Sequence, residues 1–411
     1  MEKILNFDSV TEELYKQIDI TPTQYDLAKS HYEAVAKCLT EDGVATDVYT
    51  QGSFAFGTVI RPYREGRDAD FDIDLVAQSS DDKLILKPRV LKKSVGKCLD
   101  KSQYHKNLLD PNEGRRCWTL NYAPTDGVGF HMDVLPCVHE ENEIINKIVF
   151  KNIPLSIAKK AIAITDFDKD GDTYDWSTGN SHGLVDWFKN INTPYLQAVS
   201  EYQRRILVEK KAYASIEAVP EPLLKSSLQR VIQLFKRHRD VRFDRQPDYA
   251  YRPISIIITV LVAQIAAEKK LYNASVKELL QAVVEELSQY SSLNQDFYAY
   301  SAERLAQRNA VIIKRDSDGW HLCNPVNPYE NFAERWTEDG NARAKAFFKW
   351  VEWIKSDFGF DRADSADKFT SLQKSFGEEA TKRIYANLNL NATKSVPTII
   401  TGVNQPKPYR R

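Results

Sequence analysis

Residues 68–76 alternate carboxylates with apolar side chains, in the order Asp-Ala-Asp-Phe-Asp-Ile-Asp-Leu-Val. Successive side chains of a β-strand point to opposite faces, so a strand here turns Phe71, Ile73 and Leu75 toward a core and stacks carboxylates on the other side. Stacked carboxylates repel one another unless a cation lies between them, and Mg²⁺ prefers such oxygen ligands. A solvated edge strand carries the same alternation, so this segment alone leaves both interpretations open.

Two other segments favour the metal-binding interpretation. Gln51-Gly52-Ser53 ends a short β-branched stretch in a turn, where backbone N–H groups and a hydroxyl can hold a phosphate. Asp133 lies in an apolar stretch that is also predicted to be a strand, where an unpaired carboxylate is costly to bury. A Gly-Ser turn, an Asp-x-Asp strand and a third Asp on a neighbouring strand together predict a three-carboxylate metal site beside a phosphate-binding turn.

The pattern of apolar residues changes near residue 155. Before it we expect helices at 22–40 and over the basic stretch 87–97, and strands at 46–50, 70–77, 117–122 and 128–138. After it we expect long helices at 183–212, 221–239, 252–268, 275–290 and 343–357. The 411 residues exceed what one core usually supports. We therefore predict an α+β protein with a mixed-sheet lobe, residues 1–180 including an N-terminal helix, and a helical lobe, residues 181–387.

Composition limits the partners and the location. The chain has 56 Lys+Arg against 57 Asp+Glu, and this balance argues against a protein that coats long nucleic acid. The first thirty residues carry charges throughout, unlike a signal peptide, and the most apolar run, 254–267, is shorter than the roughly 20 residues that a bilayer needs. Five cysteines without a C-x-x-C pair favour a reducing compartment, so we expect a cytoplasmic protein without a membrane partner.

The motifs together resemble those of nucleotidyltransferases with a polymerase-β-like core, in particular the bacterial CD-NTases, relatives of cyclic GMP-AMP synthase and 2′-5′ oligoadenylate synthase. In the first lobe the matching stretches are Gly-Ser-x-x-x-Gly-Thr at 52–58, Asp-x-Asp at 72–74 and Asp-Val-Leu-Pro at 133–136. In the second lobe they are the helix at 228–236, the Pro-Ile-Ser at 253–255 and the Asn-Pro-x-x-Pro-x-x-Asn at 324–331. The resemblance covers roughly residues 20–380 and keeps the order of these elements.

The resemblance implies a bilobal nucleotidyltransferase that joins NTPs, ATP among them, into a cyclic oligonucleotide second messenger and releases pyrophosphate. It implies that Asp72, Asp74 and Asp133 are catalytic and bind two Mg²⁺ ions, with Mn²⁺ as an alternative. The implied nucleotide-binding residues are Gln51, Gly52, Ser53, Lys236 and Ser255. Because four acidic residues precede Leu75, Asp70 with Asp72 is an alternative metal pair, although the apolar run after Asp74 favours Asp72 with Asp74.

The resemblance also implies a biological setting and partners. Such enzymes resemble the sensors of bacterial anti-phage signalling operons, in which the product activates a separate effector. We expect residues 388–411 to form a flexible basic tail, which an operon-encoded regulator could contact.

Several alternatives stay open. The chain could transfer nucleotides to RNA 3′ ends or to a protein hydroxyl, or it could be a catalytically inactive nucleotide-binding module. Lys236 could be an ordinary solvated lysine of a basic helix. Residues 166–177 begin like a calcium-binding loop but end in Ser instead of Glu. Finally, His131, Cys137 and His139 are close enough in sequence to suggest zinc, at a spacing that does not favour it.

Overall fold

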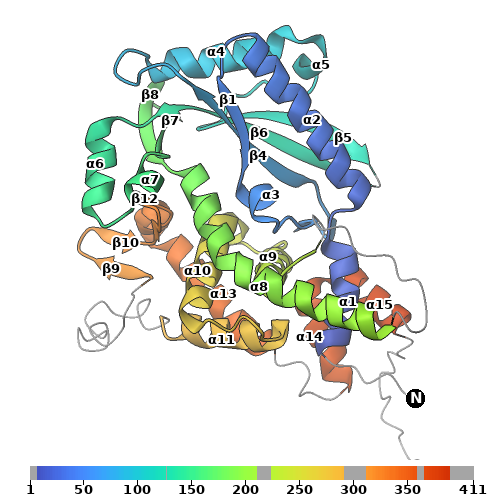
Figure 1. Cartoon of the computed structure of the whole chain (residues 1–411). Coiled ribbons are helices and arrows are strands. Elements are labelled where there is room, and N and C mark those ends of the chain that lie inside the picture. The colour runs from blue at the N-terminus through green and yellow to red at the C-terminus, as the bar shows by residue number, and fades with distance from the viewer. Residues whose placement is uncertain (1–6, 126, 211–223, 291–311, 359–364, 389–411) are drawn as a thin grey trace, which may run out of the picture.

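The structure, a computed structural model, describes residues 7–125, 127–210, 224–290, 312–358 and 365–388. A six-stranded mixed sheet forms one half of the molecule, and helices form the other half (Figure 1). This is the predicted α+β architecture. No helix in the described ranges is both long and apolar enough to cross a bilayer.

The sheet has the strand order β1-β4-β6-β7-β8, and β5 also pairs with β6. Only the pairing of β4 with β6 is parallel. The predicted strands are present, as β1 (Asp47–Gln51), β4 (Phe71–Ser79), β5 (Trp118–Thr125) and β6 (Val128–His139). Sequence reasoning missed two further strands between residue 155 and the first long helix predicted after it, β7 (Ile162–Asp168) and β8 (Thr173–Gly179), which extend the sheet.

Two helices cover one face of the sheet. They are α2 (Pro22–Glu41) and α4 (Pro88–Lys101). α2 begins with a capping box, in which the Thr21 hydroxyl accepts from the Gln24 backbone N–H and the Gln24 side chain accepts from the Thr21 backbone N–H. Ile73 and Leu75 of β4 are fully buried beneath these helices, as the alternation of residues 68–76 predicts.

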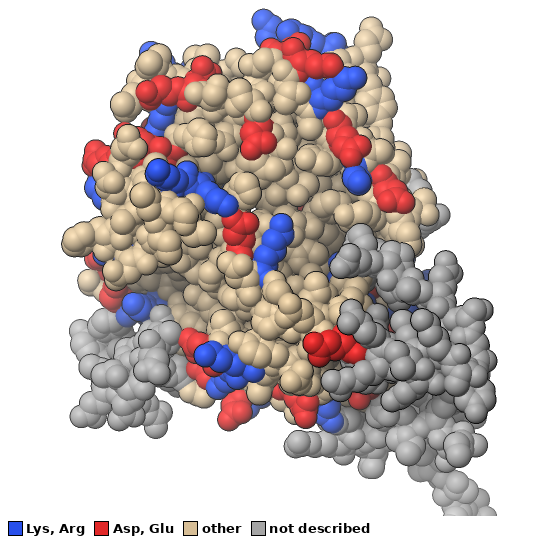
Figure 2. All heavy atoms as spheres, viewed as in Figure 1, with Lys and Arg blue, Asp and Glu red and all other residues tan. Residues whose placement is uncertain are grey.

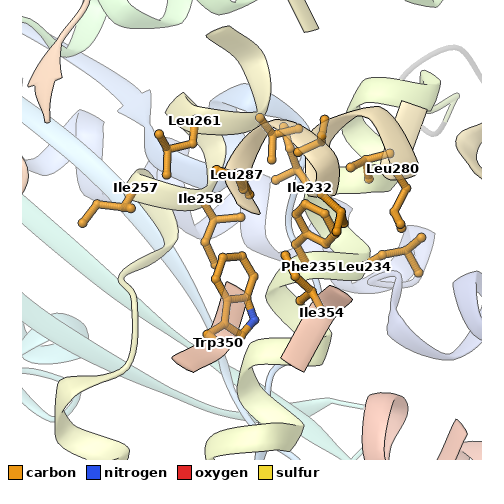
Figure 3. Packing of buried hydrophobic residues seen from close by; sticks show 14 of the residues in the cluster. Ile232, Leu234, Phe235, Ile257, Ile258, Leu261, Leu280, Leu287, Trp350 and Ile354 are labelled. Carbon is orange, nitrogen blue, oxygen red and sulfur yellow. The ribbon is translucent and has the colours of Figure 1, made fainter. Parts of the chain in front are cut away.

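The helical half packs around one central helix, α9 (Ser227–Phe243). Its neighbours include α8 (Ser181–Lys210), α10 (Ser255–Lys269), α11 (Val276–Ser288), α13 (Ala342–Asp357) and α14 (Ser365–Phe376). Figure 3 shows how Phe235 of α9 and Trp350 of α13 meet in this core, with ring centroids 5.7 Å apart. α10 is buried on most sides, as its uninterrupted apolar sequence predicts.

The two chain ends of the described structure also join this helical core. α1 (Phe7–Ile18) buries Val10, Leu14 and Ile18 in it and lies beside α15 (Glu378–Asn387) (Figure 1). The division of the chain at residue 180 stays a prediction, although α8 does begin at Ser181, directly after β8. Of the predicted tail, residues 389–411 lie outside the described residues.

The start of α9 differs from the predicted start at residue 221. The helix begins at Ser227 because the Ser226 hydroxyl accepts a hydrogen bond from the Gln229 backbone N–H, while the Gln229 side chain accepts from the Ser226 N–H. The Gln229 amide also donates to the Phe56 carbonyl oxygen, at 2.8 Å. This cap therefore fixes α9 against the short helix α3 (Gly52–Phe56), which follows β1.

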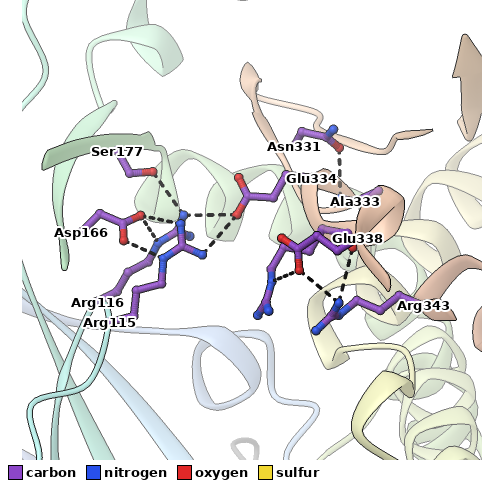
Figure 4. Close-up of polar contacts among 10 residues, drawn as sticks. Arg115, Arg116, Asp166, Ser177, Asn331, Ala333, Glu334, Glu338 and Arg343 are labelled. Carbon is purple, nitrogen blue, oxygen red and sulfur yellow. Dashed lines mark hydrogen bonds and ion pairs between the residues drawn. The ribbon is translucent and has the colours of Figure 1, made fainter. Parts of the chain in front are cut away.

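The late Asn-Pro motif lies at the junction of the two halves, outside the cavity described below. It forms β11 (Cys323–Asn324) and β12 (Asn327–Asn331), and the Asn327 amide donates to the Thr178 hydroxyl of β8 at 3.0 Å. Ion pairs continue this junction: Arg115 and Arg116 bind Asp166 of β7 and approach Glu334 of the helical half (Figure 4). Asp166 is therefore an ion-pair partner of arginines and not a calcium ligand.

Removal of the Trp350 side chain should destabilise the helical core. The indole is fully buried, and its Nε1–H donates to His238 Nδ1 at 3.2 Å, so Trp350→Ala creates a cavity and leaves a buried nitrogen without its donor. We expect a loss of about 3–5 kcal/mol in the free energy of unfolding, measured by urea denaturation. Phe150→Ala is the matched control, because the Phe150 ring is 84% exposed and its removal should change stability little.

Candidate active site

The pairing of β4 with β6 brings the three predicted carboxylates together. Asp74 lies directly opposite Asp133 in the parallel register, and Asp72 lies two residues earlier on the same face of β4. This face is opposite to the face that buries Ile73 and Leu75. The carboxylates therefore share the face of the sheet opposite its apolar core, as the sequence predicts.

The carboxylates repel one another in this arrangement. Burial, together with the charges of Asp72 and Asp133, raises the pKa of Asp74 to about 7, although Lys236 opposes this shift. Burial and Asp133 likewise raise the pKa of Asp72, which lines a cavity. Asp133 has a local partner, because the Thr119 hydroxyl on β5 donates to its Oδ1 at 2.5 Å.

The first two acidic residues of the segment, Asp68 and Asp70, bind neighbouring groups. The Asp70 carboxylate accepts a hydrogen bond from the Gly129 backbone N–H at 2.7 Å, so it fixes the start of β6. Asp68, the first acidic residue of the segment, forms an ion pair with Arg237 at 2.8 Å. Both residues thus have structural partners, whereas Asp74 faces Asp133.

Gly52 lies directly against Asp74. β1 ends at Gln51, which is the register partner of Asp74, and Gly52 then turns the chain with φ of +61°. A Cβ atom at Gly52 would lie 2.1 Å from Asp74 Oδ2, so only glycine leaves room for the carboxylate. Ser53 follows as the second residue of α3 and lines the cavity.

A cavity of about 770 Å³ lies between the two halves. One wall comes from the sheet half, with Ser53 and Asp72, and from the hairpin of β2 (Tyr63–Arg64) and β3 (Arg67–Asp68). The opposite wall comes from α9, from the turn η2 (Tyr249–Tyr251) and from the start of α10. The cavity has the size of a typical small-molecule site.

Lys236 is a buried residue of this cavity and not a solvated lysine. Its side chain is only 3% exposed, and its amine donates to the Thr58 carbonyl and hydroxyl oxygens at 3.2 and 3.0 Å. Burial and the neighbouring Arg239 lower the pKa of Lys236 to about 7, although Asp240 and Asp74 oppose this shift. A buried amine of this kind gains most from an anionic ligand.

Ser255 lies on the same wall of the cavity, at the start of α10. It is the first residue of this helix, and the preceding Ile254 provides no side-chain cap for the backbone N–H groups. The N-terminus of α10 thus combines unpaired N–H donors, a positive dipole end and a hydroxyl, which together suit a phosphate. The structure therefore brings Ser53, Asp72, Lys236 and Ser255 to one cavity.

The other predicted site residues do not line this cavity: Gln51, Gly52, Asp74 and Asp133. They lie together behind it, because Gln51 and Asp133 are the register partners of Asp74 and Gly52 packs against Asp74.

Sequence reasoning missed two charged residues of the cavity, Arg239 and Asp240. Both are buried on α9, and the Arg239 guanidinium donates to Asp240 Oδ1 through Nε and Nη2, at 2.9 and 2.7 Å. The available signal was their spacing from Lys236. Residues three and four positions later on a helix share its face.

The residues fit a divalent cation chemically. Hard carboxylate oxygens are the ligands that Mg²⁺ prefers, and a cation beside Asp72 and Asp74 would relieve the repulsion that raises both pKa values. In the part of the chain that the structure describes, no group of three or more His, Cys, Asp or Glu side chains is arranged to hold a metal ion. The Asp133 carboxylate is bound to Thr119 instead.

The zinc alternative finds no support in the structure. His131 lies beside the Asn121 amide, with its Nδ1 2.7 Å from the amide oxygen, and His139 lies 2.8 Å from the Gln78 amide nitrogen. Cys137 is buried in a separate apolar cluster on the sheet. These three residues therefore have different surroundings and form no common site.

Comparisons with known proteins agree with this geometry. Residues 46–136 match the family described as "Cyclic GMP-AMP synthase DncV-like, nucleotidyltransferase domain". This range contains β1, the Gly-Ser turn and all three carboxylates. The chain therefore contains a DncV-like nucleotidyltransferase domain. The c-di-GMP synthase of Roseivirga ehrenbergii is 26% identical over 326 residues, which cover 78% of this chain and 70% of that protein.

Solved CD-NTase structures share the whole fold of this nucleotidyltransferase. The Bradyrhizobium diazoefficiens CD-NTase CdnG in complex with GTP superposes with a TM-score of 0.63 at 20% identity, covering 93% of this chain and 99% of that chain. The Vibrio cholerae DncV cyclic AMP-GMP synthase superposes with a TM-score of 0.54 at 12% identity, covering 92% and 98%. At these identities the likeness concerns the fold.

Gly52→Ala should disable the nucleotidyltransferase by displacing Asp74. Gly43→Ala is the matched control, because Gly43 also has a positive φ, +68°, but has no atom within 4 Å of a new Cβ. Both substitutions should cost about 1–2 kcal/mol of unfolding free energy through the left-handed backbone. Only Gly52→Ala should abolish pyrophosphate release from NTPs. Equal activity of the two variants would contradict the close approach of Gly52 to Asp74.

The raised pKa of Asp74 should make the metal-free protein less stable as pH rises. Between pH 4 and pH 7 native Asp74 keeps a proton that the unfolded chain has lost, so stability falls over this interval. In EDTA, the melting temperature of Asp74→Asn minus that of wild type should therefore grow from pH 5 to pH 8. The control is Asp26→Asn, which changes an exposed carboxylate of α2 and should give the same melting-temperature difference from wild type at pH 5 and pH 8. A melting-temperature difference for Asp74→Asn that does not change with pH would contradict the prediction.

Proposed function

We propose that this nucleotidyltransferase joins NTPs into a cyclic oligonucleotide second messenger and releases pyrophosphate. The observation that carries the proposal is the pairing of two opposite walls in one cavity. One wall has Asp72 of β4, next to Asp74 and its register partner Asp133, and the other has buried Lys236 and the uncapped start of α10. The first suits a cation and a reacting hydroxyl, and the second suits a triphosphate.

Each residue has a definite role in this proposal. Asp72, Asp74 and Asp133 would hold two Mg²⁺ ions, or Mn²⁺, which supply charge neutralisation and activation of the attacking ribose hydroxyl. Lys236 would leave its bond to Thr58 and neutralise the β- and γ-phosphates. The Ser53 and Ser255 hydroxyls would donate to phosphate oxygens, and Gly52 and Gln51 would hold the turn against Asp74.

The shape of the site favours cyclisation over transfer to a polymer. A linear intermediate that stays in the cavity presents its own triphosphate and hydroxyl to the same carboxylates, which makes ring closure effectively unimolecular. Figure 2 shows acidic and basic side chains interspersed over the visible face, without a continuous basic stripe along which RNA could bind. RNA 3′ ends and protein hydroxyls are therefore the weaker candidates.

The names of the relatives support the substrate class and suggest a setting. They include a c-di-GMP synthase, a CD-NTase in complex with GTP, and an Escherichia coli CdnC:HORMA complex. We infer NTP substrates, a cytoplasmic anti-phage signalling role, a separate effector that the product activates, and a regulator that contacts the tail.

The product of the reaction tests the proposal. A cyclic phosphodiester has no terminal phosphate, so alkaline phosphatase should leave it intact while it degrades NTPs and linear intermediates. We expect a phosphatase-resistant product, identified by mass spectrometry, from four NTPs with Mg²⁺ and no added acceptor. Asp72→Asn with Asp74→Asn should remove it and leave the fold intact.

Two results would overturn the proposal. A product that is fully sensitive to phosphatase, or one that forms only with added RNA or protein, would favour the transferase alternative. No pyrophosphate release by the wild-type protein under any of these conditions would favour an inactive nucleotide-binding module.

A further inference from the structure

Arg239 connects the helix that carries Lys236 to the helix that Ser255 begins. Its Nη1 donates to the Ser255 hydroxyl oxygen and to the Pro253 carbonyl oxygen, both at 3.0 Å. Its Nε and Nη2 donate to Asp240 Oδ1 on α9. The guanidinium is therefore fixed on one side by a carboxylate of its own helix and bonded on the other to the start of α10.

The bond to Arg239 determines what the Ser255 hydroxyl can do. A guanidinium has only donors, so the serine oxygen must accept, and its single O–H points elsewhere. Among the described residues this hydroxyl has no acceptor for its hydrogen. Because Ser255 lines the cavity, the hydrogen remains available to an anionic ligand there.

The ion pair with Asp240 limits the other roles that Arg239 could have. Two of its donors are committed to one carboxylate oxygen and two to the 253–255 turn. A guanidinium has five N–H groups, so one remains. Arg239 thus uses most of its N–H groups to hold the turn in place and keeps one for a ligand in the cavity.

We propose that Arg239 is a positioning residue that fixes the Ser255 hydroxyl as a donor to the triphosphate of the bound NTP. Asp240 in turn holds the guanidinium in the geometry that this requires. The inference rests on the proposed function, because it assumes that the triphosphate lies between Lys236 and Ser255.

A double-mutant cycle tests the inference, because residues that act through one hydrogen bond are not additive. One change is Ser255→Ala, and the other is the paired substitution Arg239→Met with Asp240→Asn, which removes the link and keeps the net charge of the cavity. The measured quantities are the dissociation constants of α,β-methylene ATP and α,β-methylene GTP with Mg²⁺, by calorimetry on the full chain. Arg230→Met with Asp19→Asn is the matched control, since Arg230 lies on the same helix as Arg239 and its ion pair with Asp19 lies outside the cavity.

If Arg239 acts through Ser255, Ser255→Ala should weaken binding of at least one of the two analogues about tenfold, and the paired substitution should weaken it similarly. The triple variant should then be within about twofold of Ser255→Ala alone. The control pair should lower the melting temperature and leave the dissociation constants unchanged. If the Arg239 and Asp240 pair does not fold, Arg239→Lys repeats the cycle, since one amine is too small to bind Asp240 and the turn together.

Other outcomes overturn the inference in separate ways. If the two effects multiply in the triple variant, Arg239 contacts the nucleotide itself, and if the paired substitution leaves the dissociation constants unchanged, Arg239 acts only on stability. If Ser255→Ala binds both analogues as wild type does, the proposed triphosphate position is wrong as well. The double-mutant cycle could also give the expected result while no cyclic product forms. In that case the proposed reaction is wrong, and the positioning role of Arg239 is retained.

Discussion

Electrostatic repulsion between carboxylates on two adjacent parallel strands is the constraint on which the rest of the structure depends. Asp74 and Asp133 lie opposite each other because β4 and β6 are in register, and Asp72 adds a third charge on the same face. Such an arrangement is unfavourable in a metal-free protein, as the raised pKa values of Asp72 and Asp74 show. The apolar core behind β4 holds the strands in place despite this repulsion.

The surroundings of the carboxylates follow from the same constraint. Gly52 allows one carboxylate to pack against the backbone, where any larger residue would displace it. Lys236 faces this acidic edge from α9, and Arg239 beside it is paired with Asp240. The helical half thus places a buried amine near the carboxylates of the sheet half, whose hairpin adds Arg64 and Arg67 to the lining of the cavity.

Much of this could be predicted because the relevant signals are local in sequence. The alternation of apolar and acidic residues predicted β4 and placed Asp72 and Asp74 on the same face of this strand. The capping residues predicted the start of α2. The roles of Lys236 and Ser255 came only from the family resemblance, since a lysine on a basic helix carries no sign of its burial. Their common cavity became evident only in three dimensions.

The elements that could not be predicted depend on tertiary contacts. β7 is a short buried run, which periodicity cannot distinguish from a helical segment, and β8 pairs with it as a polar edge strand. Arg239 becomes significant only because α10 begins beside it, and nothing in the sequence around residue 239 indicates this neighbour. The observed start of α9 likewise depends on Gln229, which both completes the cap and bonds to Phe56.

The bond between Lys236 and Thr58 has a mechanical consequence. Thr58 follows α3 in the sheet half and Lys236 belongs to α9, so this buried contact joins the two halves of the molecule. A triphosphate that binds the Lys236 amine must compete with the hydrogen bond to Thr58. Binding would therefore break one contact between the halves and form another through the nucleotide. Nucleotide binding and the relative motion of the two halves are therefore thermodynamically linked. A change that separates the halves alters nucleotide affinity, and nucleotide binding alters the tendency of the halves to separate by the same free energy.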